Sequence, residues 1–185
     1  VADGELCWPL PGHTYISCHF GEVDAFGNAG HRGTDIPAPE GTPILAAHSG
    51  TVLVSGWNDS YGNQVLLDNG AGLSTRYAHM TQTAVTAGEA VTAGQVIGYV
   101  GSTGDSTGNH LHFEVMQNGV RMNPLELGRD FFYCGKNLPF REVRNSTMIF
   151  LFASGTDQDF FTRPHEEHVF DMINVAARDV DNAVV

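Results

Sequence analysis

The first two thirds of the chain are a succession of short apolar runs separated by turn-forming residues. Runs in which apolar and polar side chains alternate, or in which β-branched residues gather, are typical of strands, and the Gly, Asn and Pro residues between them mark turns. We therefore expect strands at 16–20, 43–47, 51–55, 64–68, 73–79, 90–91, 96–100, 110–116 and 120–122. Together they predict a mainly β fold, a compact antiparallel sheet or sandwich.

Two of the connections carry further information. Glycines at 21, 27, 30 and 33 predict a loop that delivers His31 and Asp35, and the prolines that follow keep the chain extended rather than helical. Asn69-Gly70 between apolar runs is a hairpin signal, and the extra Ala71-Gly72 predicts a loop longer than the tight two-residue type.

Beyond Gly128 the pattern changes. Residues 148–153 form a continuous apolar run, and from Pro164 onward apolar residues recur at the three- and four-residue spacing of an amphipathic helix. We expect two parts, a β-domain over 1–128 and an α-containing C-terminal extension of unknown role over 129–185.

Charge narrows the choice of partners. The chain of 185 residues has 21 acidic and 9 basic side chains and a formal net charge of −12. Electrostatic attraction to nucleic acid or to anionic lipid is therefore disfavoured, and a neutral, zwitterionic or cationic substrate is expected. No apolar run has membrane-spanning length. The chain starts at Val1 without a signal stretch, which suggests a piece of a larger precursor whose export signal lies upstream.

The three cysteines leave the redox state open. A bridge between Cys7 and Cys18 across the first turn and three unbridged thiols both fit the spacing, and Cys134 makes the number odd.

The chemistry concentrates in two segments, 30–37 and 108–115. In the second, alternation on a strand places His110 and His112 on the same face. The first offers His31 and Asp35, four residues apart around a glycine. Two imidazole nitrogens and one carboxylate oxygen are the usual protein ligands of a catalytic zinc ion, which keeps its fourth position for water.

The surrounding residues resemble a known family. The resemblance rests on the motifs His31-Arg32-Gly33-Thr34-Asp35-Ile36, Arg76-Tyr77-Ala78-His79-Met80 and Gly108-Asn109-His110-Leu111-His112-Phe113-Glu114, and on the glycine-rich run over 85–104. In this order and spacing they are similar to the lysostaphin-type (LytM-like) zinc metallopeptidases. The likeness covers residues 8 to 127 and does not extend to the last third.

The resemblance implies a lysostaphin-like fold with a duplicated hybrid motif, and a division of roles. His31, Asp35 and His112 would bind Zn²⁺, and His79 and His110 would act on the attacking water and the developing oxyanion, without a residue-by-residue assignment of these two roles. The implied substrates are peptides of bacterial peptidoglycan, cut in an extracytoplasmic setting without an acyl-enzyme.

The loop 60–63 is a place where such domains carry residues of the substrate groove. Tyr61 and Asn63 are therefore candidates for substrate binding, and a plain turn fits these residues equally well.

Two other functions are weighed against the peptidase. A catalytically inactive relative that binds peptidoglycan or activates another hydrolase would have lost metal ligands, whereas this chain has all five site residues. A histidine phosphocarrier would also bring two histidines together, but it gives no reason for Asp35.

Overall fold

The computed structural model describes residues 6–127, 131–132 and 139–140. Nearly all of the regular structure is β. The elements in chain order are β1 (Thr34–Pro37), β2 (Pro43–Leu45), β3 (Gly50–Asn58), β4 (Gly62–Gly70), β5 (Leu73–Thr83), β6 (Ala90–Val91), β7 (Val96–Val100), β8 (His110–Gln117), β9 (Val120–Met122), α1 (Pro124–Leu127), β10 (Phe131–Phe132) and β11 (Pro139–Phe140).

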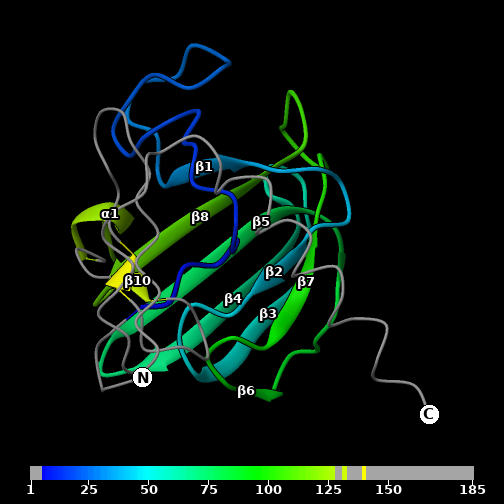
Figure 1. Cartoon of the computed structure of the whole chain (residues 1–185), viewed down its shortest axis with the longest axis vertical. Helices are drawn as coiled ribbons and strands as arrows, with labels where there is room; N and C mark the ends of the chain where they lie inside the picture. The colour runs from blue at the N-terminus through cyan, green and yellow to red at the C-terminus, as the bar shows by residue number, and fades with distance from the viewer. Residues whose placement is uncertain (1–5, 128–130, 133–138, 141–185) are drawn as a thin grey trace, which may run out of the picture. The chain divides into compact units, whose positions relative to one another are not determined.

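One antiparallel sheet contains the first nine strands. Its main path runs β1-β8-β5-β4-β3-β6, and Figure 1 shows β8, β5, β4 and β3 side by side in that order. The long strand β5 pairs with β4 along one edge and with two strands in succession along the other: residues 73–78 pair with β8, whereas Met80 and the residues after it pair with β7. Strand β2 joins β7, and β9 joins β8. The predicted antiparallel β fold is confirmed.

The core lies against one face of this sheet. Leu111, Phe113 and Val115 on β8 are fully buried in an apolar cluster that also contains Ile36 of β1 and Tyr77 of β5. Because strand side chains alternate between faces, the residues between them on β8 point to the opposite face. That opposite face is polar and carries the candidate site.

The first expected strand is wrong. Residues 16–20 form no strand, and Cys18 makes only an isolated bridge to Asp35. The first regular strand is instead β1, in a segment that the sequence predicted as a loop followed by extended chain. Pro37 is tolerated there because β1 ends the main path of the sheet, where a missing backbone N–H leaves no partner unpaired.

The hairpin between β4 and β5 is tighter than expected. Gly70 pairs with Leu73, so the loop consists of Ala71 and Gly72 alone. Both have positive φ, 49° and 77°, as the two-residue turn that suits the twist of a hairpin requires. Asn69 and Gly70 therefore lie at the end of β4, directly before the turn.

Little of the expected extension falls within the described residues. Strands β10 and β11 form a separate two-stranded antiparallel pair. The apolar run 148–153 and the helix predicted after Pro164 lie outside the described residues, and the division at residue 128 remains a prediction. No helix in the described part of the chain is both long and apolar enough to span a membrane.

The cysteines do not form the bridge considered from the sequence. Cys7 is disulfide-bonded, whereas Cys18 is a free, buried thiol. A Cys7–Cys18 bridge is therefore excluded, as is the alternative of three unbridged thiols, and Cys134 lies outside the described residues.

Candidate metal and catalytic site

The register of three strands brings the polar side chains together. Asp35 on β1 lies directly opposite His112 on β8, and Ala78 on β5 lies opposite His112 on its other side. Directly opposite residues of antiparallel strands point to the same face. The methyl side chain of Ala78 thus leaves space beside the imidazole of His112.

His31 reaches the same place from the loop before β1. Its backbone N–H donates to the Glu22 carbonyl at 2.9 Å, and its Nδ1 lies 3.2 Å from the His19 carbonyl, which together fix the ring. Gly33 allows the loop to approach β8 closely, because a Cβ there would lie 2.4 Å from the Phe113 carbonyl oxygen. A side chain at this position would push His31 away from the sheet.

Three donor atoms form a compact triangle. Nε2 of His31 lies 3.1 Å from Nδ1 of His112 and 3.2 Å from Oδ1 of Asp35, and the last two atoms are 2.8 Å apart. Zinc bonds of about 2.0–2.2 Å in tetrahedral geometry separate neighbouring ligand atoms by about 3.3 Å. The triangle therefore fits one face of a zinc tetrahedron.

The carboxylate of this triangle is held in its charged form. Burial alone would raise the pKa of Asp35, but hydrogen bonds from His112 and His31 outweigh burial and place the pKa well below its usual range. For His112, burial lowers the pKa, and the carboxylates of Asp35 and Glu114 more than compensate and raise it. The Asp35 oxygen that belongs to the donor triangle is therefore anionic, as a metal ligand must be.

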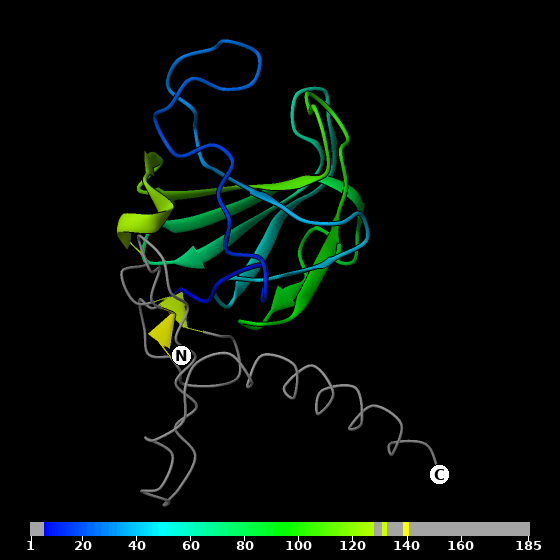
Figure 2. The ribbon, with the colours of Figure 1, turned by 45° about the horizontal axis from the view of Figure 1, so that its top comes forward.

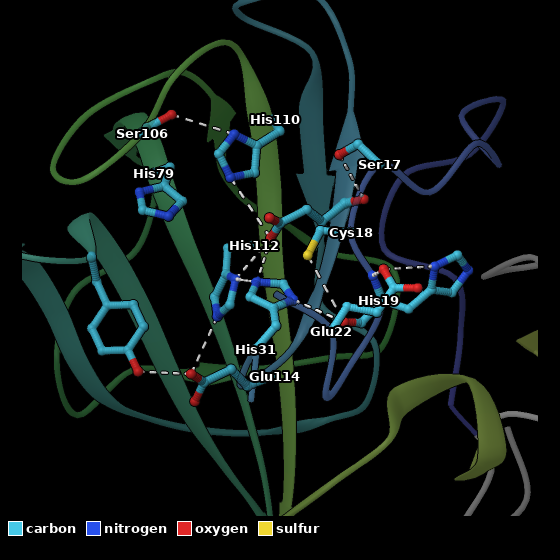
Figure 3. A network of polar contacts seen from close by, with 12 residues as sticks. Ser17, Cys18, His19, Glu22, His31, His79, Ser106, His110, His112 and Glu114 are labelled. Carbon is cyan, nitrogen blue, oxygen red and sulfur yellow. Dashed lines mark hydrogen bonds and ion pairs between the residues drawn. The ribbon is translucent and has the colours of Figure 1, made fainter. Parts of the chain in front are cut away.

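Two further imidazoles border the triangle, and Figure 3 shows His79 and His110 beside His112. Nδ1–H of His79 donates to the Thr103 carbonyl at 2.8 Å, and Nδ1–H of His110 donates to the Gly108 carbonyl at 2.7 Å. These bonds select the tautomer in which Nε2 is the free acceptor. The two ring centroids are 4.7 Å apart, and Nε2 of His110 lies 3.7 Å from Oδ1 of Asp35.

His79 reaches the site through a β-bulge. Asn63 of β4 pairs with Met80 and Val65 pairs with Tyr77, so two residues of β5 oppose one residue of β4. His79 has φ of 60°, and its N–H donates to the Tyr61 carbonyl at 2.8 Å. The bulge allows Tyr77 and Met80 both to enter the core. Burial lowers the pKa of His79 to about 4, so its imidazole is neutral near pH 7.

The two candidate groove residues lie differently. Tyr61 lines the pocket, but its hydroxyl donates to Oε1 of Glu114 at 2.7 Å and is therefore already engaged. Asn63 does not line the pocket. Its side-chain amide donates to the Thr81 carbonyl, and its backbone N–H donates to Oγ1 of Thr103, so it joins the β3–β4 turn to the loop after β7.

Two residues near the site had no role assigned from the sequence. Glu114 lies on the site face of β8 and contacts His112, and the alternation that placed His110 and His112 together already implied this position. Cys18 offers a sulfur within 4.8 Å of donor atoms of His31 and Asp35. Burial, followed by the charge of Asp35, raises the pKa of Cys18 to about 11, which keeps it a thiol. The triangle completed by His112 has shorter separations, of 2.8 to 3.2 Å, and is the stronger candidate for a metal site.

A pocket of about 620 Å³ opens over the triangle. Figure 2 shows the loop before β1 and the loop after β7 rising from the same side of the sheet. Residues of both loops form the walls. Six of the seven predicted site residues line the pocket: His31, Asp35, Tyr61, His79, His110 and His112. The open pocket suits an extended chain that passes across the site.

The chain is also similar in sequence to known proteins. The chain matches the model of Peptidase family M23 over residues 29–124. Peptidoglycan DD-endopeptidase ShyC of Vibrio cholerae is 47% identical over 94 residues, which cover 51% of this chain and 22% of that protein. The chain thus spans about a fifth of the length of ShyC and of several other curated relatives that it matches.

Solved structures show the same likeness. The catalytic domain of lysostaphin from Staphylococcus simulans has a TM-score of 0.60 at 32% identity, covering 65% of this chain and 95% of that one. A zinc-containing peptidase from Vibrio cholerae has a TM-score of 0.59 at 30% identity, covering 63% of this chain and 37% of that one.

Proposed function

The chain belongs to peptidase family M23, and on that basis we propose that it is a zinc metalloendopeptidase that hydrolyses peptide bonds of bacterial peptidoglycan. The observation that carries the proposal is the triangle of donor atoms on His31, Asp35 and His112, with separations of 2.8 to 3.2 Å. When bound there, zinc would supply a Lewis acid that activates water and polarises the scissile carbonyl.

His79 and His110 are proposed to move protons. Each imidazole has its Nδ1–H bonded to a backbone carbonyl and its Nε2 free as an acceptor. One Nε2 would take a proton from the attacking water, and the other, once protonated, would donate to the oxyanion and then to the leaving amine. The Ser106 hydroxyl lies 3.3 Å from Nδ1 of His110, but that nitrogen already donates to the Gly108 carbonyl at 2.7 Å and is not free to take a proton from the hydroxyl. We therefore propose attack by water without a covalent step.

Two features support the substrate and the setting. The open pocket between two loops suits an extended peptide, and the net charge of −12 suits a peptide that is zwitterionic or carries a free amine. The disulfide at Cys7 agrees with an oxidising, extracytoplasmic setting, where peptidoglycan is found. The alternative of an inactive binding or activating module is less well supported, because all five proposed site residues are present and line one pocket.

Digestion of purified muropeptides of defined cross-link type, with and without a zinc chelator, tests the proposal. We expect mass spectrometry to detect new amine and carboxyl ends that disappear with chelator and return when zinc is added, and these ends identify the bond that is cut. Stoichiometric zinc without any cleavage would contradict the peptidase and favour the binding or activating module.

A further inference from the structure

A buried carboxylate lies directly behind the proposed metal site. Glu114 is 0% exposed, and its two oxygens meet polar groups from four separate segments. Oε1 accepts from Nε2 of His112 at 3.2 Å and from the Tyr61 hydroxyl at 2.7 Å. Oε2 accepts from Nε of Arg121 at 3.2 Å and lies 3.6 Å from Nε of Arg76.

The two arginines compensate the buried charge. An isolated carboxylate without partners in the interior is strongly unfavourable, whereas one with paired guanidinium groups and hydrogen bonds is tolerated. Arg76 also donates Nη1–H to Gln64 at 2.7 Å, and its guanidinium lies 4.4 Å from the centre of the Tyr61 ring. Arg121 donates a second bond, from Nη2 to the Tyr61 hydroxyl, at 3.3 Å. Glu114 is thus fixed in position from every side.

Only one partner of Glu114 belongs to the metal site. His112 contributes Nδ1 to the donor triangle, and its other nitrogen, Nε2, faces Glu114. A carboxylate acceptor at Nε2 selects the tautomer with the proton on Nε2 and leaves the lone pair of Nδ1 free for a metal. Since the ring is fixed at both nitrogens, its plane is fixed as well.

From this juxtaposition we infer that Glu114 is a positioning residue of the metal site, which orients His112 and is itself held by Tyr61 and Arg121. The inference rests on the proposed function, because it assumes that zinc binds at the triangle. It also gives Tyr61 a second role beside the proposed contact with substrate, since its ring lines the pocket while its hydroxyl supports Glu114.

Zinc affinity of the full chain, measured by competition with a chromophoric chelator, tests this role independently of catalysis. Glu114→Ala is expected to bind zinc about 10- to 100-fold more weakly, as is typical when the outer partner of a ligating histidine is removed. Glu114→Gln retains one acceptor oxygen and is expected to lose less. The visible absorption of the Co²⁺-substituted protein should shift in both variants, because the orientation of His112 changes.

Two tyrosines provide a matched pair. Tyr61→Phe removes the hydroxyl that supports Glu114 and is expected to weaken zinc binding about 3- to 10-fold. Tyr77→Phe removes a buried hydroxyl on the core face of the same sheet, and it is expected to leave zinc affinity unchanged. In a Glu114→Ala background, Tyr61→Phe should cause no further loss, because it acts through Glu114.

Each outcome supports or overturns the inference. Folded Glu114 variants that bind zinc within twofold of the parent would overturn it, and so would Tyr61→Phe and Tyr77→Phe variants with equal affinities. If the Glu114 variants do not fold, the comparison of zinc affinity between Tyr61→Phe and Tyr77→Phe tests the inference. If the parent protein binds zinc but cuts no muropeptide, the proposed function is wrong, and the zinc affinities of the variants still test this inference. If the parent protein binds no zinc, both the proposed function and this inference are wrong.

Discussion

His112 occupies the position on which the other site residues converge. Its Nδ1 meets Asp35 and His31, its Nε2 meets Glu114, and its neighbour across β5 is the small Ala78. His110 lies two residues away on the same face, but its Nδ1 is bonded to a backbone carbonyl and its Nε2 stays 3.7 Å from Asp35. The two histidines of one short motif therefore have different chemistry.

Alanine substitutions should separate these two roles. We expect His112→Ala to lose stoichiometric zinc, because one of three ligands is removed, and to lose all activity. His110→Ala should keep its zinc and lose about 10²- to 10⁴-fold in kcat, the usual contribution of a general acid or base. Metal analysis after dialysis and muropeptide kinetics measure both. A His110→Ala protein without zinc would contradict the division of roles.

Tyr77 gives the stability of the fold a dependence on alkaline pH. Its hydroxyl is fully buried, accepts from the Ala47 N–H at 2.7 Å and donates to Oγ1 of Thr75, and burial raises its pKa to about 12. The unfolded chain releases this proton near pH 10. The stabilisation is therefore complete below pH 10 and is lost as the pH rises toward 12.

Tyr77→Phe should remove this dependence. At pH 9 the variant is expected to be about 1–3 kcal/mol less stable, since the Ala47 N–H is left unpaired. At pH 11.5 the difference should shrink by about 2 kcal/mol, because only the parent is destabilised by ionisation. Urea unfolding followed by circular dichroism at both pH values measures it. An equal difference at pH 9 and 11.5 would show that Tyr77 does not titrate as argued.

At the scale of elements, departures from regular strand geometry position the proposed catalytic residue His79. Uninterrupted alternation along β5 would point His79 into the core, since Tyr77 is a core residue two positions earlier. The bulge reverses this, and Gly62, with φ of 64°, lets the β3–β4 turn lie against Thr103, which binds the His79 ring. A Cβ at Gly62 would lie 2.2 Å from Oγ1 of Thr103.

The β4–β5 hairpin offers a stabilising substitution. Ala71 has φ of 49°, a conformation that costs an L-residue about 1–2 kcal/mol, whereas glycine adopts it freely. Glycine also makes the unfolded chain more flexible, at a cost of about 0.4–1 kcal/mol. Ala71→Gly should therefore raise the free energy of unfolding by about 0.5–1 kcal/mol, measured by urea titration.

Gly72→Ala serves as the opposite control. Gly72 has φ of 77°, and a Cβ there would lie 2.0 Å from Oδ1 of Asn118. We expect this variant to be less stable than the parent. If Ala71→Gly also lowered the free energy of unfolding, the backbone strain at Ala71 would be smaller than the entropy cost of the added glycine, and the prediction would be wrong.

For the whole molecule, metal binding should stabilise the fold. The triangle joins the loop before β1 to strands β1 and β8, so a ligand bound there favours the folded state by mass action. Free zinc at about 100 times its dissociation constant contributes about 2.7 kcal/mol, which corresponds to about 5–10 °C in Tm for a chain of this size. Thermal unfolding with zinc and with chelator measures the shift, and His112→Ala should show none.

The family, the β class and much of the candidate site were predictable from local signals. The period of two along β8 places His110, His112 and Glu114 on one face, and the structure brings together the five residues that the motifs singled out. The two wrong predictions also rested on local signals. Residues 16–20 form only an isolated bridge, from Cys18 to Asp35, and the two-residue turn directly follows Asn69-Gly70 instead of containing it. In both places the pairing in the folded sheet overrides the short-range propensity.

The sequence by itself determined which chemical groups are available and which of them share a strand face, since alternation follows from covalent geometry. Only the tertiary structure decided that Asp35 lies opposite a histidine 77 residues away, that a bulge turns His79 to the site, and that Glu114 meets two arginines and Tyr61. Strand register depends on turns and on packing between distant segments, and those are properties of the folded sheet as a whole.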